Sequence, residues 1–496
     1  MTVRTRAEWE ALAESTSVDP RLFIDGEHVS AASDERIKMI NPADGVLQAE
    51  VEAAAEEDVD RAVEAAQRAF DSGSWSGLHP RDRKRLMLAL ADLVEERRDE
   101  FALLISLDMG KVISDAQGEI DISLTVLRFY AESVDKVFGE VAPVGPGGLA
   151  TITREPLGVV GAIVPWNYPL MMVMWKIAPA LAVGNTVIVK PAEQSPRVAL
   201  LLAELAMHAG FPRGVLNVLP GFGPVVGRAI GLHPGIAKVT FTGSTSTGRL
   251  ILQYAAASNM KRTSVELGGK SATILLEDTP DLAVAASMLA EGIFGNTGQV
   301  CNASSRILVH RGIRDRFLEE LQRQTEVWRS GHPLDPASKM GPLVTAAQKE
   351  RVEGYLQLAR EEGGETHSWS ASAPDGPGNY LDPFVVTGLG NRARVAQEEI
   401  FGPVATVIDF DDDDEAIRLA NDSDYGLAAG VWTADVTKAI TYTRRLMAGS
   451  VYVNCWDYGD ITLPFGGFKQ SGIGRDKSLH ALHGFTELKS TYINLS

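Results

Sequence analysis

GVVGAIVPW (158–166) opens a series of short Val/Ile-rich runs, each of which ends in Pro or Gly. The series continues with NTVIVKP (185–191), GVLNVLPG (214–221) and AKVTFTG (237–243), and helical segments separate the runs. Continuous apolar strands that alternate with helices indicate a parallel sheet covered on both faces. The sequence therefore predicts a doubly wound α/β domain over about residues 156–264.

A second series of strand-like runs follows the first. It comprises SATILLE (271–277), RILVH (306–310), ATVIDF (405–410), AGVWT (429–433) and SVYVN (450–454). These runs also alternate with helical stretches, which predicts another α/β unit over about residues 265–460. A chain of 496 residues is too long for one compact core. We therefore expect two lobes with a cleft between them.

The flanking segments show simpler patterns. Residues 21–31 predict a hairpin around Asp25 and Gly26, and residues 58–107 predict a pair of amphipathic helices. APVGPGGLA (142–150) predicts a turn. The C-terminal FTELKSTYINLS (485–496) has a β-type pattern with nothing after it to pair with. Such an edge strand is expected to be completed by another subunit.

The charge of the chain excludes several classes of partner. The 47 basic and 65 acidic side chains give a formal net charge of -18, which repels phosphate backbones and anionic lipid. We expect no nucleic-acid partner. The run Asp411 to Asp414 predicts a solvated turn before a helix that starts near Glu415, because no His or Cys lies close by to make a metal site. No metal is expected.

The small number of cysteines and the hydropathy of the sequence indicate the cellular compartment of the protein. Cys301 and Cys455 are the two cysteines of the chain, which excludes a disulfide framework and fits a reducing compartment. The first residues lack the apolar segment of a signal peptide, and no apolar run reaches the roughly 18 residues that cross a bilayer. The sequence predicts a cytoplasmic protein with no membrane partner.

The segment FGNTGQVCNASSR (294–306) predicts a nucleophile. Cys301 follows a Gly/Asn-rich bend, and its neighbours Gly298, Gln299 and Asn302 are small or polar, unlike those of a packed strand. The alternative is a buried structural cysteine, which is the common role of a lone Cys. A thiol with a pKa near 8.5 costs about 2 kcal/mol to ionise fully at pH 7, so a base or dipoles are needed nearby.

Two further segments supply candidate partners for that cysteine. Glu266 in SVELGGKS (264–271) ends a β-type run, and the two glycines after it would let substrate or cofactor approach. It is a candidate base, with a surface glutamate as the alternative. Asn167 in VPWNYPLMM (164–172) is held between two prolines at the carboxyl end of a strand. It is a candidate oxyanion donor, with a turn-forming Asn as the alternative.

Gly-rich bends predict a nucleotide site. GFGPVVG (221–227) and FTGSTSTG (241–248) follow apolar runs and open helices, where backbone amides bind phosphate. Plain turn glycines explain the first bend equally well. Lys190 and Glu193 in VIVKPAEQSP (187–196) could hold ribose hydroxyls. A carboxylate about 4 Å from a 2'-phosphate costs on the order of 4 kcal/mol, so Glu193 favours NAD over NADP.

Six motifs occur along the chain in this order: PWNYP, KPAE, FTGSTSTG, ELGGKS, GNTGQVC and QEEIFGPV. In these motifs and their order, the sequence from about residue 20 to the C-terminus resembles the aldehyde dehydrogenase superfamily. The resemblance implies that Cys301 attacks an aldehyde and that Glu266 activates water to hydrolyse the resulting thioester. It implies that Asn167 and the backbone amide of the nucleophile form the oxyanion hole. It also assigns Lys176 to proton movement.

The same resemblance implies the remaining cofactor contacts. Lys190 and Glu193 are assigned to the adenosine ribose, and Gly243 with Ser244 to the pyrophosphate. Glu399 is assigned to the nicotinamide ribose and Phe401 to the nicotinamide. The predicted set also contains Pro165, Trp166, Gly223, Gly227, Phe241 and Leu267.

The resemblance further implies an architecture. A Rossmann-type NAD-binding domain would comprise residues 1–132 and 155–264, and an α/β catalytic domain residues 265–477. A small β oligomerisation domain would comprise residues 133–154 and 478–496 and would make a homodimer or homotetramer.

The C-terminal segment 453–489 looks like the bacterial ω-aminoaldehyde branch, which includes γ-glutamyl-γ-aminobutyraldehyde and guanidinobutyraldehyde dehydrogenases of putrescine, agmatine and arginine breakdown. Asp457 and Asp460, with Asp121 as a third candidate, would face an amine, guanidine or amide tail, unless they are only solvated. The predicted substrate passage also contains Tyr168, Trp175, Asn302, Trp456 and Phe465, whose aromatic members would otherwise be core.

Gly295 and Asn302 depart from the commonest family pattern, which would make the pocket wider or more polar. Three alternatives remain open. The first is a broad-range or betaine aldehyde dehydrogenase, the second a CoA-acylating enzyme, against which Glu266 argues, and the third a non-catalytic protein that retains the fold.

Overall fold

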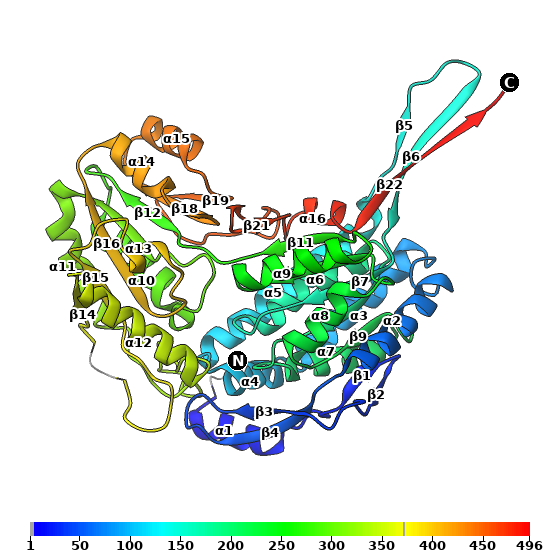
Figure 1. Cartoon of the computed structure of the whole chain (residues 1–496), viewed down its shortest axis with the longest axis horizontal. Coiled ribbons are helices and arrows are strands. Elements are labelled where there is room, and N and C mark those ends of the chain that lie inside the picture. Colours follow the sequence, from blue (N-terminus) through cyan, green and yellow to red (C-terminus); the bar gives the residue numbers. More distant parts are fainter. Residues whose placement is uncertain (1–3, 371–372) are drawn as a thin grey trace.

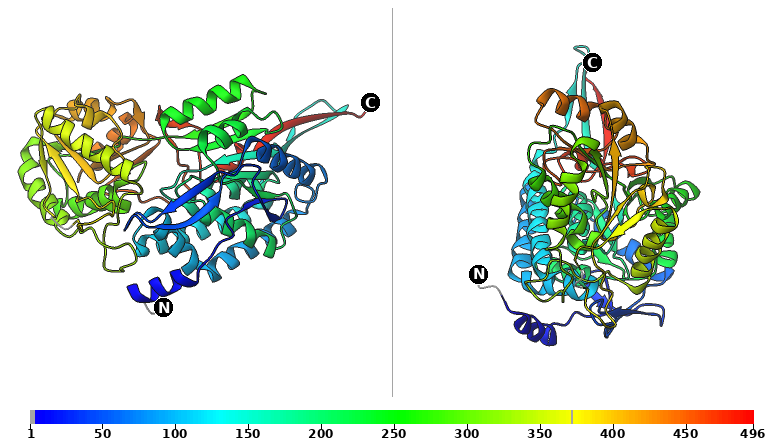
Figure 2. Two further views of the ribbon diagram at one scale, coloured as in Figure 1. Left: turned by 60° about the horizontal axis from the view of Figure 1, so that its bottom comes forward. Right: turned by 90° about the vertical axis from the view of Figure 1, so that its left-hand side faces the viewer.

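Two α/β lobes and a projecting β arm make up the molecule (Figure 1). The structure is a computed structural model and describes residues 4–370 and 373–496. The lobe coloured blue to green in Figure 1 contains the N-terminal half of the chain, and the lobe coloured green to orange contains most of the rest. Figure 2 shows that the arm stands clear of both lobes.

The first lobe is built on an eight-stranded sheet with the order β2-β1-β9-β8-β7-β10-β11-β21. Its bounds are β1 Leu22–Ile24, β2 Glu27–Val29, β7 Val159–Ile163, β8 Thr186–Lys190, β9 Leu216–Val218, β10 Lys238–Thr242, β11 Arg262–Glu266 and β21 Gly472–Ile473. Strands β7 to β11 are parallel, and the strand order reverses between β7 and β10. The doubly wound prediction is confirmed. Ligands bind at such a reversal, outside the carboxyl ends of the strands.

Helices cover both faces of this sheet (Figure 1). They are α2 Glu56–Asp71, α3 Pro80–Glu96, α4 Arg98–Met109, α5 Ile113–Ser133, α6 Pro169–Ala182, α7 Arg197–His208, α8 Arg228–Leu232 and α9 Thr245–Ala257, and α1 Arg6–Ser15 packs on α4 at the outside of the lobe. The predicted helix pair over residues 58–107 is wrong, because three helices lie there. Arg97 leaves helical geometry (φ -99°, ψ 17°) without a Gly or Pro, so the apolar periodicity runs on through the break.

The second lobe is built on a seven-stranded sheet with the order β14-β15-β16-β13-β12-β18-β19. Its bounds are β12 Ala272–Leu275, β13 Arg306–His310, β14 Glu365–His367, β15 Phe384–Thr387, β16 Val404–Phe410, β18 Ala428–Trp432 and β19 Ser450–Val453. Its helices are α10 Leu282–Phe294, α11 Arg314–Thr325, α12 Ala346–Glu361, α13 Arg394–Gln397, α14 Asp413–Asn421 and α15 Val436–Arg445. All strands but β14 are parallel to their neighbours, as the second series of apolar runs predicts.

The arm is a three-stranded antiparallel sheet. Its strands are β5 Glu140–Ala142, β6 Gly148–Pro156 and β22 Thr486–Asn494, in the order β22-β6-β5. The predicted turn within residues 142–150 joins β5 and β6. The C-terminal strand β22 pairs with β6 over nine residues, within the two segments that the resemblance groups in one small β domain, and it is an edge strand as predicted. Among the described residues, strand β22 has no second neighbour within this sheet.

Short elements complete the chain. They are β3 Arg36–Ile40, β4 Leu47–Glu52, β17 Tyr425–Gly426, β20 Phe468–Lys469, α16 His480–His483, the 3-10 turns η1 Val134–Lys136, η3 Gly295–Gly298 and η4 Arg311–Ile313, and the π turn η2 Gly223–Gly227. Strands β3 and β4 pair with each other, as do β17 and β20. The predicted hairpin turn is present, with positive φ at Asp25 (52°) and Gly26 (78°).

The acidic run before α14 is a helix start. Asp412 caps the helix by accepting a hydrogen bond from the Glu415 amide at 2.9 Å, so α14 begins two residues before the predicted Glu415. Asp411 pairs with Arg311. Within residues 4–370 and 373–496 there is no cluster of three potential metal ligands among His, Cys, Asp and Glu. No helix in these ranges is both long and apolar enough to cross a membrane.

Candidate active site

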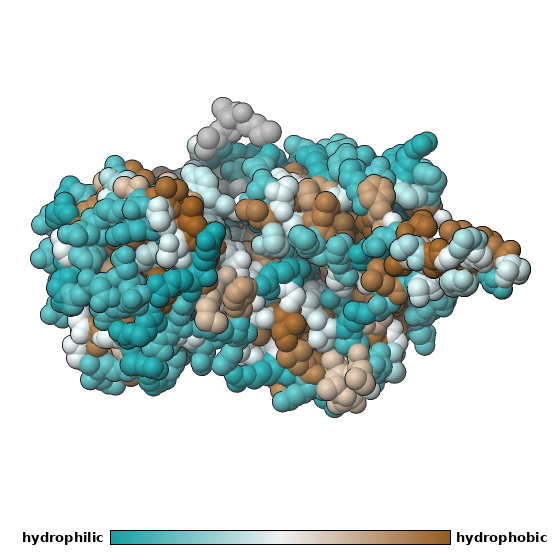
Figure 3. Space-filling view, turned by 90° about the horizontal axis from the view of Figure 1, so that it is seen from above, coloured by the Kyte–Doolittle hydropathy of each residue, from teal (hydrophilic) through white to brown (hydrophobic). Residues whose placement is uncertain are grey.

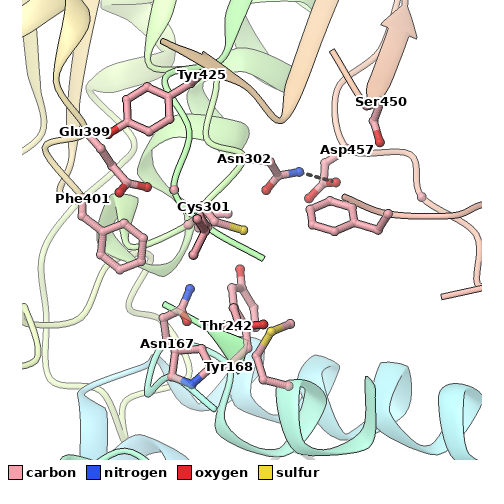
Figure 4. Close-up of a pocket in the computed structure, with 18 of the residues that line it drawn as sticks. Asn167, Tyr168, Thr242, Cys301, Asn302, Glu399, Phe401, Tyr425, Ser450 and Asp457 are labelled. Carbon is pink, nitrogen blue, oxygen red and sulfur yellow. Dashed lines mark hydrogen bonds between the residues drawn. The ribbon is translucent and has the colours of Figure 1, made fainter. Parts of the chain in front are cut away.

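A cleft of about 1190 Å³ lies where the carboxyl ends of the first sheet face the second lobe. Figure 4 shows its centre, where Cys301 and Asn167 approach each other from opposite lobes. Most predicted site residues line the cleft. They are Pro165, Trp166, Asn167, Tyr168, Trp175, Gly243, Ser244, Leu267, Cys301, Asn302, Glu399, Phe401, Asp457 and Phe465.

The nucleophile follows a left-handed turn. Asn296 (φ 49°), Thr297 (φ 56°) and Gly298 (φ 70°) lie in succession in the left-handed region, which side chains other than that of Gly rarely adopt. A Cβ at Gly298 would lie 2.2 Å from the Gly402 carbonyl carbon. Thr297 Oγ1 donates to the Gly341 carbonyl at 3.0 Å and helps to hold the turn. Backbone strain of this kind concentrates at functional sites.

Cys301 itself is half-buried in the cleft. Burial raises the pKa of its thiol, and the carboxylates of Glu399, Asp457 and Glu266 raise it further, while the Asn302 amide lowers it. The resting group is therefore the neutral thiol. A base, or a change in the charges around it on ligand binding, must help it to react as a thiolate.

Asn167 lies across from the thiol. Its Nδ2 donates to the Gln299 carbonyl at 2.9 Å, and Asn296 Nδ2 donates to the Asn167 carbonyl at 3.0 Å. These bonds tie the end of β7 to the loop that carries Cys301. An amide NH2 has two hydrogens, so one remains for an oxyanion beside the sulfur.

Glu266 ends β11 directly behind the cleft wall formed by Leu267. It is 4% exposed, and neither carboxylate oxygen has a hydrogen-bond partner among the residues that the structure describes. Burial raises its pKa well above the ordinary value, Asp476 adds to this, and Lys176 and Arg475 oppose it. A buried carboxyl without a partner is costly to stability. A carboxyl whose pKa is raised in this way, and which acts electrostatically on the Cys301 thiol, suits a proton acceptor.

Lys176 does not reach the cleft. Its ammonium forms a buried ion pair with Asp476, the residue that also acts on Glu266. Gly268 lines the cleft, and Gly268 and Gly269 leave room for the residues around it. A Cβ at Gly268 would lie 2.1 Å from Glu399 Oε2, and one at Gly269 would lie 2.6 Å from the Cys301 carbonyl oxygen.

One end of the cleft lies at the start of α9. Ser244 caps this 13-residue helix by accepting a hydrogen bond from the Thr247 amide at 3.3 Å. Glu399 accepts a hydrogen bond from the Gly269 amide at 3.1 Å, and burial raises its pKa to about 7. Phe401 packs edge to face on Trp166 with ring centroids 5.4 Å apart.

The predicted ribose residues lie together outside the lining of the cleft. Glu193 Oε1 accepts a hydrogen bond from the Gly223 amide at 2.7 Å and lies 3.3 Å from Lys190 Nζ. Gly227 is close to the same lysine, with a Cβ position 3.9 Å from Lys190 Cδ. Phe241 is buried, and its ring packs on Gly243.

The opposite end of the cleft carries the substrate candidates that the structure brings together. Asp457 Oδ1 accepts hydrogen bonds from Asn302 Nδ2 at 2.9 Å and from the Tyr452 hydroxyl at 3.1 Å. Figure 4 shows Asn302 and Asp457 on one side of Cys301, with Glu399, Phe401 and Tyr425 on the other. Trp175 and Phe465 pack edge to face at 5.1 Å. Tyr168 lies under the Lys111 ammonium, 3.7 Å from the ring centroid.

Three predicted substrate residues lie outside the lining, which corrects those expectations. Asp121 is exposed on α5 and pairs with Arg98 at 2.8 Å. Asp460 accepts hydrogen bonds from the amide and hydroxyl of Thr462 and so closes its own turn. Trp456 is buried beside Tyr452, with ring centroids 5.2 Å apart, and is core.

The comparisons with known proteins agree on one family. Residues 28–491 match the model of the Aldehyde dehydrogenase family. The chain belongs to the aldehyde dehydrogenase family. It is 47% identical over 493 residues to the NADP/NAD-dependent aldehyde dehydrogenase PuuC of Escherichia coli K12, covering 99% of this chain and 98% of that protein.

Solved structures agree. The indole-3-acetaldehyde dehydrogenase AldA of P. syringae, in complex with NAD+ and IAA, is 49% identical with a TM-score of 0.98, over 99% of this chain and 100% of that one. The γ-glutamyl-γ-aminobutyraldehyde dehydrogenase of Burkholderia cenocepacia J2315 is 48% identical with a TM-score of 0.97, over the same shares. This aldehyde dehydrogenase is thus an NAD(P)-dependent enzyme, and the predicted fold and enzyme class are confirmed.

The cleft of this aldehyde dehydrogenase fits the nicotinamide cofactor. The hydroxyls of Thr242 and Thr245 are buried and have no hydrogen-bond partner among the described residues. Both residues line the cleft at the start of α9, where backbone amides and the helix dipole attract phosphate. Thr242, Thr245 and the α9 amides thus offer donors to a pyrophosphate.

The structure also shows residues of the aldehyde dehydrogenase that the sequence does not single out. Glu119 on α5 is buried, accepts hydrogen bonds from the Leu170 and Met171 amides that open α6, and pairs with Lys111 at 2.5 Å. It thereby fixes the helix start next to Asn167. The one feature of the sequence that could have pointed to Glu119 is that it places a carboxylate on an otherwise apolar face of the helix. Lys477 lines the cleft as well, and no motif signals it.

Proposed function

We propose that this aldehyde dehydrogenase uses NAD to oxidise an aldehyde to a carboxylic acid through a thioester on Cys301. The observation that carries the proposal is the arrangement around that sulfur. Cys301 lines the cleft opposite Asn167 (Figure 4). The buried carboxyl of Glu266, which has no hydrogen-bond partner among the described residues, directly precedes Leu267 in the cleft wall. A nucleophile, an oxyanion donor and a base are the groups that acyl transfer to water requires.

The chemistry follows from these positions. The Cys301 thiol releases its proton to solvent and its sulfur bonds to the aldehyde carbon, so that the carbonyl oxygen becomes an oxyanion that accepts a hydrogen bond from Asn167 Nδ2. The former aldehyde hydrogen then leaves the adduct as hydride, and the C=O bond of a thioester forms. A bound nicotinamide supplies the hydride acceptor. Glu266 takes a proton from water, whose oxygen bonds to the acyl carbon while the carbon–sulfur bond breaks. Lys176 and Asp476 are then the neighbours able to pass that proton on.

Glu193 supports a preference for NAD over NADP. Its carboxylate is held by the Gly223 amide and lies beside Lys190, where the ribose is predicted to bind. A 2'-phosphate would meet this negative charge. The proposed cofactor contacts that line the cleft are Pro165, Trp166, Gly243, Ser244, Leu267, Glu399 and Phe401.

The substrate class is proposed to be a butyraldehyde with an ω-amino, guanidino or γ-glutamylamino group. Support comes from Asp457, which lines the cleft beside Asn302, and from the name of the similar Burkholderia cenocepacia enzyme. A broad-range aldehyde dehydrogenase is the second candidate. The aromatic wall that Trp175 and Phe465 form favours the broad-range enzyme, because such a wall also binds aldehydes with uncharged tails.

The arm is proposed to make a homodimer or homotetramer. Val141, Leu488 and Tyr492 expose 72%, 56% and 63% of their surfaces on it, and Figure 3 shows apolar side chains gathered there, at the right of the view. Exposed apolar patches mark interaction sites. The arm corresponds to the proposed domain of residues 133–154 and 478–496. Both cysteines are free thiols, which supports a cytoplasmic location.

The test is NADH formation by the purified protein with NAD and a panel of aldehydes. The panel contains 4-aminobutyraldehyde, 4-guanidinobutyraldehyde, the γ-glutamyl aldehyde, betaine aldehyde and propanal. We expect the Cys301→Ala variant to bind NAD and to lose NADH formation by on the order of 10⁴-fold or more. A variant that kept aldehyde oxidation would exclude the thioester, and equal rates over the panel would favour the broad-range enzyme.

A further inference from the structure

Two charged side chains face the substrate end of the cleft. Of the described residues that line the cleft, five are charged, and three of these belong to the cofactor end. There Arg351 donates to the Glu399 carbonyl, and Glu398 accepts from Tyr355. The other two are Asp457 and Lys477. The substrate end therefore carries one carboxyl and one ammonium.

Lys477 is held in the wall of the cleft by its backbone. Lys477 (φ 61°) and Ser478 (φ 54°) are consecutive residues in the left-handed region, and so is Asp457 (φ 52°). The Ser478 amide donates to the Ile461 carbonyl at 2.7 Å, and the Tyr130 hydroxyl donates to the Ser478 carbonyl at 3.0 Å. Strain at side chains that face a cleft is a pointer to function. Here the strained backbone conformation occurs at both charged residues, Asp457 and Lys477.

The ammonium of Lys477 is near acids without touching them. Burial lowers its pKa, and the charges of Asp457 and Asp460 raise it. Among the described residues no carboxylate oxygen lies within the 4.0 Å of an ion pair with it. Its nearest aromatic neighbour is Trp175, whose ring centroid is 5.7 Å away. All three of its N–H donors thus remain for a ligand in the cleft.

Asp457 is fixed in a different way. Both of its hydrogen bonds, from Asn302 and Tyr452, end on Oδ1, which sets the plane of the carboxyl group. Burial raises its pKa, and these two donors and the Lys477 charge lower it. One partner is the residue directly after the nucleophile. The carboxyl group therefore belongs to the same wall as the reacting sulfur.

We propose that Lys477 and Asp457 together recognise an α-amino-acid group at the far end of the aldehyde, Lys477 binding its carboxylate and Asp457 its ammonium. A tail that carried only an ammonium would satisfy Asp457 and meet the positive charge of Lys477. A tail with both charges satisfies both groups. The inference rests on the proposed function and selects, within its substrate class, the γ-glutamylamino aldehyde over the free amine.

The test compares four aldehydes that differ in the charge of the tail. They are γ-glutamyl-γ-aminobutyraldehyde with both charges, succinic semialdehyde with a carboxylate, 4-aminobutyraldehyde with an ammonium, and butanal with neither. The wild-type enzyme is expected to have the highest kcat/KM with the first. In Lys477→Met, the ratio of kcat/KM for the γ-glutamyl aldehyde to that for butanal should fall about tenfold, mainly through KM.

Two variants sharpen the comparison. Lys477→Glu should also raise kcat/KM for 4-aminobutyraldehyde relative to butanal, because the wall then carries two acids. Lys38→Met removes an exposed lysine on β3, away from the cleft, and should keep the wild-type ratio. If Lys477→Met lowers kcat/KM equally for all four aldehydes, the lysine has a structural role and the proposal fails.

The outcomes also separate this inference from the proposed function. If the wild-type enzyme forms NADH with butanal as efficiently as with every charged tail, the recognition of the tail is wrong and the dehydrogenase stands. If none of the four aldehydes nor any of the panel gives NADH, the proposed function itself is wrong.

Discussion

The two ends of the cleft are built from different kinds of sequence. At the cofactor end, the contacts come from strand ends and helix starts, such as Thr242 and Ser244 between β10 and α9. At the substrate end the two charged residues, Asp457 and Lys477, come from the segment after β19 and lie twenty residues apart. A strand end is placed by the whole sheet, whereas a loop side chain is placed by its own turns. The positions of the groups that bind the cofactor are therefore set more firmly by the fold than the positions of the groups that recognise the tail of the substrate.

The largest effect should come from the centre, where the two ends meet. Glu266→Gln removes the base and keeps the shape, so steady-state turnover should fall by about 10²- to 10³-fold, while the first turnover still forms NADH. Rapid mixing with NAD and aldehyde should show a burst of NADH followed by a slow phase. Loss of the burst together with the slow phase would show that Glu266 acts before the thioester forms.

The pH dependence gives a second readout of the same variant. Because burial raises the pKa of Glu266, the carboxyl is protonated at low pH and becomes a base only as the pH rises through that raised value. The hydrolysis rate of the wild type should therefore increase with pH, and Glu266→Gln should lose this limb. The control Glu64→Gln changes an exposed glutamate on α2 and should retain it.

At the cofactor end, Glu193→Gln should shift the preference between the two dinucleotides. The substitution removes the negative charge and keeps an acceptor for the Gly223 amide, which Glu193 now binds at 2.7 Å. Because the side chain is partly exposed, solvent weakens the charge, and we expect the NADP to NAD ratio of kcat/KM to rise on the order of tenfold. An unchanged ratio would remove Glu193 from the basis of NAD preference.

The same contrast explains what the sequence could predict. Cys301, Glu266 and Asn167 could be found because each ends a strand or follows a distinctive bend, so local pattern and sheet topology agree on its place. The resemblance groups the segments of β6 and β22 in one domain, but their register could not be predicted, because β6 lies more than 300 residues earlier in the chain. Glu119 and Lys477 could not either, since packing and loop conformation rather than residue type bring them to the site.

At the substrate end we expect the smallest effects, and there a matched pair of substitutions distinguishes two aspartates of one loop. Asp457 and Asp460 are three residues apart and have the same side chain, so the sequence could not rank them. Both residues are exposed, but the Asp457 carboxyl lines the cleft and accepts hydrogen bonds from Asn302 and Tyr452, whereas the Asp460 carboxyl accepts from Thr462 and lies outside the lining. Asp457→Asn should lower kcat/KM for the γ-glutamyl aldehyde about tenfold relative to butanal. Asp460→Asn should change that ratio by less than about twofold, since its carboxyl lies outside the lining of the cleft and solvent screens its charge. Steady-state kinetics of the matched pair checks both expectations. Equal losses in the two variants would mean that the net charge of the loop, rather than a contact in the cleft, selects the substrate.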